Sequence, residues 1–233
     1  MITFFFQHMQ LQDTAEIYPF PFSPHTSGKS EMYIGEWMAK QRADTVASGS
    51  TNTAASSLRE NLIISTKVCG YANDITWMRP NDSPTRLTKK QIIEAVDGSL
   101  KRLGTDYIDL LQFHWPDRRV FAPANGAVFQ HGYEFEGTTP VEEQLQAIEI
   151  LMKRGKIRAF GLSDETPFGV TNMVRMAEQL HLPRPVSLQI PLNLLAGQND
   201  LDQGLAEACA PGNLNVALLA HTPLAGNHFL VFN

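Results

Sequence analysis

Residues 88–114 read TKKQIIEAVDGSLKRLGTDYIDLLQFH and contain one complete helix-to-strand unit. Thr88 and Gln91 have the spacing of a helix-capping box, and apolar residues follow at helical intervals. Gly104 stands where helices commonly end in a left-handed residue. The run at 107–114 predicts a buried strand, because it is short, rich in β-forming residues and not strictly alternating.

The same unit, a short apolar run followed by a turn and an amphipathic helix, recurs along the chain. Strands that alternate with helices indicate an α/β fold with a parallel sheet covered by helices. This pattern allows either an open doubly wound sheet or a closed (β/α)8 barrel of the TIM type. The sequence has no G-x-G-x-x-G turn and no P-loop, which weakens the open nucleotide-binding alternative. Further strands are predicted at 61–68, 157–163, 186–191 and 216–220, and further helices from Ser27 to Arg42 and after Thr139 and Thr166.

The chain length sets the domain organisation. The 233 residues suffice for one sizeable core or at most two small ones, and we expect residues 1–233 to form a single domain. Residues 43–57 (ADTVASGSTNTAASS) are small and polar, which favours a flexible surface insertion. Residues 117–138 follow the carboxyl end of a predicted strand, where barrel enzymes carry their substrate loops.

Composition argues against several classes of function. The formal net charge of −5 gives no support to binding of nucleic acids or anionic membranes. No apolar run approaches the roughly 20 residues that span a bilayer, and no targeting segment is visible. The protein is therefore expected in the cytoplasm, with an organelle stroma as the alternative. Cys69 and Cys209 lie far apart without metal-ligand spacing, so we expect reduced thiols and no metal site.

Polar residues stand at or just after the ends of three predicted strands. Asp13 and Tyr18 follow the first of these strands, Lys67 closes the second and His114 closes the third. A charged or polar group that ends a buried strand is costly unless it is paired or faces a cleft. Because the carboxyl ends of parallel strands meet at one face, the four side chains are expected to surround one pocket.

Five motifs in sequence order resemble the aldo-keto reductase family, and most of all the branch of Tas-type reductases and potassium-channel β subunits. The resemblance implies a (β/α)8 barrel that reduces an aldehyde or ketone to an alcohol with NADPH. About six βα units are visible, and the first and eighth strands of the family are not recognisable, so an incomplete barrel is expected. The motifs are DTAEIY at 13–18, STK at 65–67, QFHWPD at 112–117, GKIRAFGLSDETP at 155–167 and SLQIPLNLL at 187–195.

The resemblance implies a catalytic tetrad of Asp13, Tyr18, Lys67 and His114. In this scheme the nicotinamide delivers a hydride to the carbonyl carbon, and Tyr18 delivers a proton to the developing alkoxide. The Lys67 ammonium is expected to lower the pKa of Tyr18, while Asp13 keeps Lys67 charged and His114 polarises the substrate oxygen. The alternatives are a structural Asp13–Lys67 ion pair, a core histidine and a packing tyrosine.

The resemblance also assigns residues to the cofactor and the substrate. Asp164 stands where the family usually has Asn, and an ionised carboxylate accepts hydrogen bonds but cannot donate them. His221 stands where the family most often has a Tyr that stacks on the nicotinamide. Trp77 and Trp115 are candidate walls of the substrate pocket, with core packing as an equal alternative. The implied cofactor residues are Ser163, Asp164 and Gln189 at the carboxamide, His221 on the ring, and Thr222, Pro223, Leu224 and Gly226 in the phosphate-side loop.

Three hypotheses about function follow. The first is an NADPH-dependent reductase of a small-molecule carbonyl compound, which the tetrad favours. The second is a catalytically weak binding or regulatory subunit, and the third is a non-functional fragment of a reductase. A sheet that lacks two strands of its barrel would expose its edges, so these edges are expected to promote a homo-oligomer.

Overall fold

A single sheet forms the centre of the computed structural model, which describes residues 10–47, 58–118, 137–194 and 204–225. Its six strands are parallel and follow the order β1-β2-β3-β4-β5-β6. An open doubly wound sheet reverses its strand order at a switch point, whereas this sequential order is that of a barrel. The strands are β1 (Gln10–Asp13), β2 (Leu62–Val68), β3 (Ile108–Phe113), β4 (Ile157–Ser163), β5 (Ser187–Pro191) and β6 (Ala217–His221).

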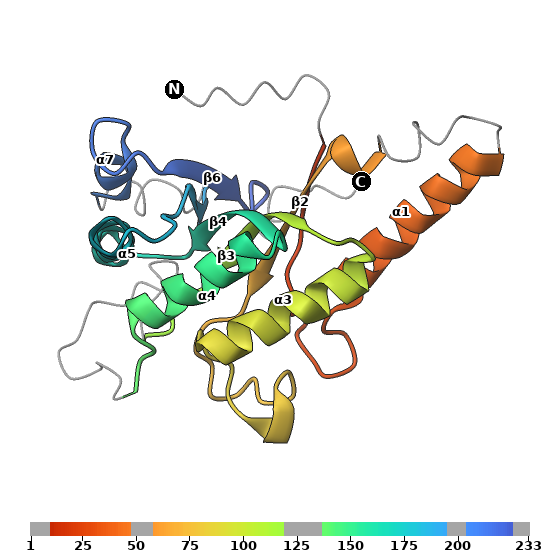
Figure 1. Cartoon of the computed structure of the whole chain (residues 1–233), viewed down its shortest axis with the longest axis horizontal. Coiled ribbons are helices and arrows are strands. Elements are labelled where there is room, and N and C mark those ends of the chain that lie inside the picture. Colours follow the sequence, from red (N-terminus) through yellow and green to blue (C-terminus); the bar gives the residue numbers. More distant parts are fainter. Residues whose placement is uncertain (1–9, 48–57, 119–136, 195–203, 226–233) are drawn as a thin grey trace.

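Helices cover one face of the curled sheet, and those that follow one another in the chain contact one another (Figure 1). Each lies between two parallel strands, as βα units require. The predicted incomplete barrel of about six βα units is confirmed for the described part of the chain. The helices are α1 (Lys29–Ala47), α3 (Lys89–Leu103), α4 (Val141–Lys153), α5 (Pro167–Leu180) and α7 (Ala206–Cys209), with a 3-10 turn η1 (Pro80–Asp82).

The ends of α3 follow the predicted capping signals in part. The Thr88 hydroxyl accepts a hydrogen bond from the Gln91 N–H at 3.3 Å, and Gly104 adopts a left-handed φ of 62°. The Gln91 side chain does not return to Thr88, because its carbonyl oxygen accepts from the Arg86 N–H and from the Arg79 guanidinium. The reciprocal half of the capping box is thus replaced by contacts that hold the loop before α3.

Alternate residues of β2 face the helices and the concave side of the sheet. Thr66 donates to the Glu31 carboxylate of α1, whereas Lys67 bonds Asp13 on the concave side. The helix-facing side packs into the main apolar core, so the polar concave side is left to hold the functional groups. Fully buried members of that core include Ile64, Ile92, Leu111, Leu145 and Ile148.

One boundary differs from the sequence prediction. Helix α1 continues to Ala47, so residues 43–47 of the predicted flexible insertion 43–57 are helical, and residues 48–57 lie outside the described part. Alanine is the strongest helix former, so Ala43 and Ala47 favour this extension, and the Thr45 hydroxyl satisfies itself within the helix by donating to the Gln41 carbonyl one turn back. The predicted substrate loop 117–138 is described only at its two ends, because residues 119–136 lie outside the described part.

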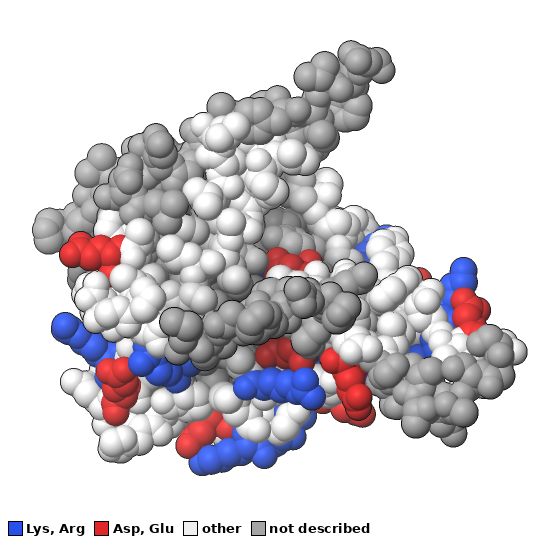
Figure 2. Space-filling view, turned by 90° about the horizontal axis from the view of Figure 1, so that it is seen from above, with Lys and Arg blue, Asp and Glu red and all other residues white. Residues whose placement is uncertain are grey.

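The two outer strands differ from the inner ones in exposure. Within the described residues, β1 and β6 each pair on one side only. Leu11 of β1 is 43% exposed and Leu218 of β6 is 37% exposed, whereas the inner strands are largely buried. The surface seen in Figure 2 carries acidic and basic side chains interspersed among uncharged ones. No described helix is long and apolar enough to cross a membrane.

Candidate active site

The structure brings the four predicted tetrad residues together at the carboxyl end of the sheet. The Lys67 ammonium donates to Asp13 Oδ2 at 2.6 Å and to the Thr14 carbonyl at 3.0 Å. Tyr18 Oη and His114 Nε2 lie 3.3 Å apart, and Lys67 Nζ lies 5.5 Å from the centre of the Tyr18 ring. These contacts join β1, β2 and β3, as expected when adjacent parallel strands end at one face.

The Tyr18 hydroxyl is a weaker acid than the sequence predicts. Burial, followed by the negative charges of Asp13 and Asp164, raises the pKa of Tyr18 to about 12. The net lowering of the Tyr18 pKa that the sequence predicts is therefore not found in the protein alone, because these effects outweigh any attraction of the Lys67 ammonium for the phenolate. The physical reason is that loss of water disfavours the phenolate, and the same Asp13 that pairs with Lys67 repels it.

His114 is a neutral imidazole in this site. Burial, and then electrostatic repulsion from Lys67 and His221, hold the pKa of His114 well below its usual range. Its Nδ1 is buried and has no hydrogen-bond partner among the described residues. A neutral ring can donate one N–H at a time, so His114 can orient an oxygen but is a poor source of protons at neutral pH.

Lys67 is among the most deeply buried polar residues of the site, with 1% of the residue exposed. Burial lowers the pKa of Lys67 below its ordinary value, and the Asp13 carboxylate opposes that shift. Gln189 of β5 also donates to Asp13 Oδ2, at 3.2 Å. Asp13 therefore connects Lys67 to a residue that the sequence assigns to the cofactor.

The residues assigned to the nicotinamide lie beside the tetrad on β4, β5 and β6. Ser163 ends β4 and is buried, and the N–H of Asp164 donates to the Gln189 carbonyl at 3.0 Å. Asp164 has a left-handed φ of 51°, a conformation that Asp and Asn tolerate better than most residues. The Asp164 carboxylate lies 3.5 Å from His221 Nε2, and His221 Nδ1 lies 2.6 Å from the Thr222 hydroxyl.

The rest of the predicted phosphate-side loop is only partly described. Pro223 and Leu224 follow Thr222 in a turn after β6, and Leu224 is 44% exposed. Gly226 lies outside the described residues. The structure thus places His221 next to Asp164 and Thr222 next to His221, and Pro223 and Leu224 follow them directly in the chain.

Both candidate substrate tryptophans lie near Tyr18. Trp77 Nε1 donates to the Ser27 hydroxyl at 3.2 Å, and Trp115 Nε1 donates to the Tyr71 carbonyl at 3.0 Å. Together with Tyr18 they pack against a small apolar cluster beneath the site, made of Ala15, Ile17, Cys69 and Ile75. These contacts show that both tryptophans pack against the core, and their role as walls of the substrate pocket stays a prediction.

Gln112 and a buried ion pair also support the site, although the sequence did not single them out. Gln112 of β3 donates to Asp13 Oδ1 at 3.2 Å and to the Ser65 hydroxyl at 2.8 Å. Glu16 accepts two hydrogen bonds from Arg79, at 2.7 and 2.9 Å, and one from the Cys69 N–H at 2.8 Å. The available signals were Gln112 within the apolar run of β3 and Glu16 in the motif just after β1, because such groups are buried only when paired.

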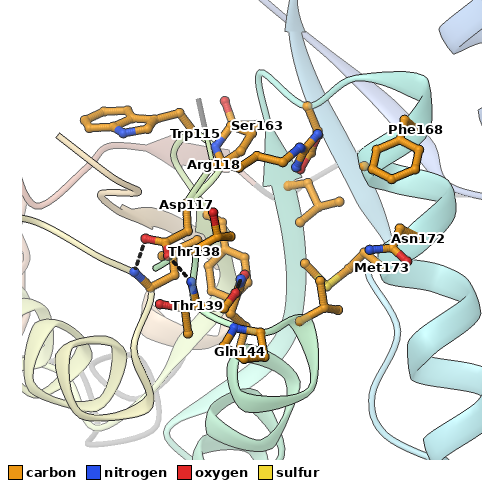
Figure 3. Close-up of a pocket in the computed structure, with 18 residues that line it drawn as sticks. Trp115, Asp117, Arg118, Thr138, Thr139, Gln144, Ser163, Phe168, Asn172 and Met173 are labelled. Atoms are coloured by element: carbon orange, nitrogen blue, oxygen red, sulfur yellow. Dashed lines mark hydrogen bonds and ion pairs between the residues drawn. The ribbon is translucent and has the colours of Figure 1, made fainter. Parts of the chain in front are cut away.

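A cavity of about 160 Å³ borders the candidate site between the ends of β3 and β4 and the first turns of α4 and α5 (Figure 3). Ser163 and Trp115 contribute to its lining, and Arg118 forms two bonds of 2.6 Å with Glu165 there. Asp117 accepts from the N–H groups of Leu87 at 2.8 Å and Thr139 at 2.7 Å, and from the Arg86 guanidinium at 2.8 Å. We call this arrangement the Asp117 clamp.

Nearly the whole chain matches a known family. The model of the Aldo/keto reductase family covers residues 3–231. The chain belongs to the aldo/keto reductase family. The resemblance found in the sequence motifs is thereby confirmed, and the motifs that carry it contain the tetrad.

Two curated relatives in this family are similar over most of the chain. An aldo-keto reductase of Babesia bovis is 44% identical over 170 residues, which cover 71% of this chain and 59% of the relative. The protein tas of Escherichia coli (strain K12) is 40% identical over 205 residues, which cover 86% of this chain and 52% of the relative. The chain therefore spans only about half to three fifths of the length of these relatives.

The fold of a solved member of the family is also similar. A thermostable aldo-keto reductase, solved in complex with the inhibitor epalrestat, superimposes with a TM-score of 0.60 at 23% identity. The match covers 95% of this chain and 57% of that chain. The likeness confirms the predicted (β/α)8-type fold.

Proposed function

We propose that the protein reduces an aldehyde or ketone to an alcohol, with NADPH as the reductant and Tyr18 as the proton donor. The observation that carries this proposal is the 3.3 Å contact between Tyr18 Oη and His114 Nε2, with the Lys67–Asp13 ion pair beneath the phenol ring. Membership of the aldo/keto reductase family supports the reaction class.

The residues around Gln189 fit a nicotinamide carboxamide, which offers two N–H donors and one oxygen acceptor. The Gln189 NH2 group donates a hydrogen bond to Asp13, so the Gln189 side-chain oxygen can accept a hydrogen bond from the carboxamide. Asp164 supplies a second acceptor, and the Ser163 hydroxyl can donate to the carboxamide oxygen. Thr222, Pro223 and Leu224 follow in the chain, where they would meet the phosphate side of the cofactor.

When bound, NADPH supplies the hydride that the carbonyl carbon accepts. The site would hold the carbonyl oxygen between Tyr18 and His114, where both side chains can donate hydrogen bonds. As the oxygen gains charge, Tyr18 transfers its proton to it and becomes a phenolate. The Lys67 ammonium stabilises that phenolate, and Asp13 keeps Lys67 in place.

Transfer of a label tests this function directly. The full chain is incubated with NADPH that carries deuterium at the transferring position of the nicotinamide, and with a simple aldehyde. We expect consumption of the cofactor and an alcohol with one deuterium at the former carbonyl carbon. Saturable NADPH binding without labelled alcohol, for any aldehyde or ketone in a broad panel, would overturn the proposal.

The second candidate function is a catalytically weak binding or regulatory subunit. The observation that favours it is the raised pKa of Tyr18, about 12, because a reluctant acid slows proton transfer. This candidate predicts the outcome that overturns the first, namely cofactor binding without turnover. The same labelling experiment therefore separates the two functions.

We also propose that the chain associates with a second copy of itself through its sheet edges. Within the described residues, β1 and β6 have unpaired outer edges, and Leu11 and Leu218 on these strands are partly exposed. Edge strands with exposed apolar residues tend to pair with another chain.

A further inference from the structure

Gln112 of β3 reaches across β2 to the carboxylate of Asp13 on β1. In the register of the sheet, Gln112 lies beside Lys67 and Asp13 lies beside Ser65, so one strand separates Gln112 from Asp13. The Gln112 Nε2 group donates to Asp13 Oδ1 at 3.2 Å and to the Ser65 hydroxyl at 2.8 Å. The bond to Ser65 fixes the direction of the amide, and the bond to Asp13 connects Gln112 to the candidate tetrad.

The two oxygens of the Asp13 carboxylate have different partners. Oδ2 accepts from Lys67 Nζ at 2.6 Å and from Gln189 Nε2 at 3.2 Å. Oδ1 accepts from Gln112, which is its one donor among the described residues. The terminal torsion of an aspartate is broad, so a carboxylate held at one oxygen only can turn. Because Gln112 binds the other oxygen, it helps to keep Oδ2 directed at Lys67.

The burial of Gln112 indicates a role beyond packing. The residue is 0% exposed, and its Oε1 is buried with no hydrogen-bond partner among the described residues. Its register neighbour on β4 is Gly161, which has no side chain that could serve as a partner. A buried amide oxygen without a partner is costly, and an apolar side chain at this position would avoid the cost. Such costs are retained mainly at functional sites.

Lys67 depends on Asp13 for its charge and its place. Burial lowers the pKa of Lys67, and the negative charges of Asp13 and then Asp164 oppose that shift. The Lys67 charge in turn contributes to the low pKa of His114. Lys67 Nζ lies 5.5 Å from the centre of the Tyr18 ring. An Asp13 carboxylate that turned away would therefore leave a buried ammonium less well paired beside the candidate proton donor.

We propose that Gln112 is a positioning residue of the reductase site, which fixes the Asp13 carboxylate so that Oδ2 keeps Lys67 in place beside Tyr18. This inference rests on the proposed function and deepens it by adding a residue outside the tetrad. Gln112 acts through Asp13 and takes no part in proton transfer. An amide suits this role, because it donates a hydrogen bond and does not ionise at neutral pH.

The titration of Lys67 tests the inference without any turnover. The full chain is labelled with 13C-lysine, and NMR follows the pKa of Lys67 in the wild-type protein and in Gln112→Met. Methionine keeps the length and burial of glutamine but supplies no donor. We expect a lower Lys67 pKa in Gln112→Met, because an Asp13 carboxylate that is less firmly held opposes the effect of burial less.

Gln144→Met is the matched control for this titration. Gln144 of α4 is also almost fully buried, at 4% exposed, and its amide donates to the Thr139 carbonyl at 2.8 Å. The control removes a buried amide of the same kind from another part of the fold. It should keep the wild-type pKa of Lys67, and an equal fall in the control would overturn the inference.

Kinetics with NADPH and a simple aldehyde test the consequence for the reaction. We expect Gln112→Met to lower kcat about 10- to 100-fold, because small displacements of reacting groups are costly. KM and the Kd for NADPH should stay within about 2-fold, since Gln112 is assigned no contact with either ligand. A general loss of folded protein would lower the active fraction without a change in the Lys67 titration.

Gln112→Glu provides a conservative rescue that depends on pH. Burial and the charge of Asp13 raise the pKa of the introduced carboxyl. Below that raised pKa the carboxyl keeps its proton and donates to Asp13 as the amide does, whereas above it the donor is lost and two carboxylates repel. The kcat/KM of Gln112→Glu should therefore approach the wild-type value near about pH 6 and fall toward about pH 9, while Gln112→Met stays low throughout.

The outcomes separate this inference from the proposed function. An unchanged Lys67 pKa or an unchanged kcat in Gln112→Met would overturn the role of Gln112. So would a ratio of Gln112→Glu to wild-type kcat/KM that is constant over the pH range, and this readout decides if Gln112→Met does not fold. A lower Lys67 pKa in Gln112→Met, in a protein whose wild type reduces no carbonyl compound, would overturn the proposed function alone.

Discussion

At the residue scale, the pKa of Tyr18 predicts how the rate of carbonyl reduction depends on pH. Because burial and Asp13 raise this pKa to about 12, the phenol keeps its proton across the neutral and mildly alkaline range. Carbonyl reduction needs the protonated phenol, so kcat/KM should not fall between about pH 7 and about pH 10 through loss of this proton. Oxidation of the alcohol needs the phenolate and should rise with pH over the same range. A fall in the reduction rate with an apparent pKa near neutrality would contradict this assignment.

Removal of the Tyr18 hydroxyl is the most direct test of the proton donor. Tyr18→Phe should lower kcat/KM for carbonyl reduction by about 10²–10⁴-fold, which is the usual contribution of general acid catalysis. Nicotinamide binding should stay near the wild-type value, because the cofactor contacts are assigned to other residues. Tyr33→Phe serves as the control, since Tyr33 lies on α1 and is 61% exposed. Near wild-type turnover by Tyr18→Phe would refute the role.

Asp164 offers a substitution that is expected to improve binding. Asp164→Asn preserves the left-handed backbone and adds an N–H donor for the carboxamide, so the Kd for NADPH should fall. The Asp164 side chain is 35% exposed, and water already competes for its contacts, so the gain should be modest, about 2- to 5-fold. Fluorescence titration measures the Kd, with the exposed Asp106→Asn as the control. A higher Kd for Asp164→Asn would show that the contact with His221 matters more.

At the scale of elements, the Glu16–Arg79 pair ties the segment after β1 to the loop after β2. Both side chains are almost fully buried, and Glu16 also accepts from the Cys69 N–H. Glu16→Gln would leave the Arg79 charge buried with a weaker partner, which typically costs about 3 kcal/mol or more. The free energy of unfolding in urea measures the effect. The control Glu149→Gln breaks only a more exposed ion pair with Lys153 on α4, so it should cost less than about 0.5 kcal/mol. Equal losses of unfolding free energy in Glu16→Gln and Glu149→Gln would refute the prediction.

The sequence predicted strands and helices well wherever local signals and burial agree. Thr88 and Gly104 delimit α3, and the apolar runs at 107–114 and 157–163 lie within one residue of β3 and β4. The end of α1 was wrong because small residues at 43–47 are compatible with both a loop and a helix.

The sequence predicted the candidate site in part. Asp13, Lys67 and His114 were predictable from strand ends, because parallel strands end at one face. The pKa of Tyr18 was not predictable, because it depends on burial and on the summed charges of Asp13 and Asp164. Gln112 was missed because its bonds to Asp13 and Ser65 join three strands that are distant in sequence.

At the scale of the whole molecule, the outer edge of β6 predicts self-association. Leu218→Lys places a charge on an exposed edge residue, and charged edges resist pairing with another chain. We expect a larger monomer fraction than in the wild-type protein by size-exclusion chromatography with light scattering at rising concentration. Val46→Lys is the control, because Val46 is 61% exposed on α1, away from the sheet edge. A wild-type protein that stays monomeric at every concentration would contradict the proposal.

The Asp117 clamp has a consequence for engineering. The Asp117 carboxylate holds the chain just before residue 119 and, by accepting from the Thr139 N–H, also just after residue 136. Leu87 and Arg86, in the loop before α3, donate to the same carboxylate and hold it in place. The closure entropy of whatever sequence joins two fixed points grows only slowly with its length. A change in the number of residues between these two anchors therefore adds little to the closure entropy that folding must overcome. An engineered library can therefore vary the length between the two anchors while strand register and helix caps stay as they are.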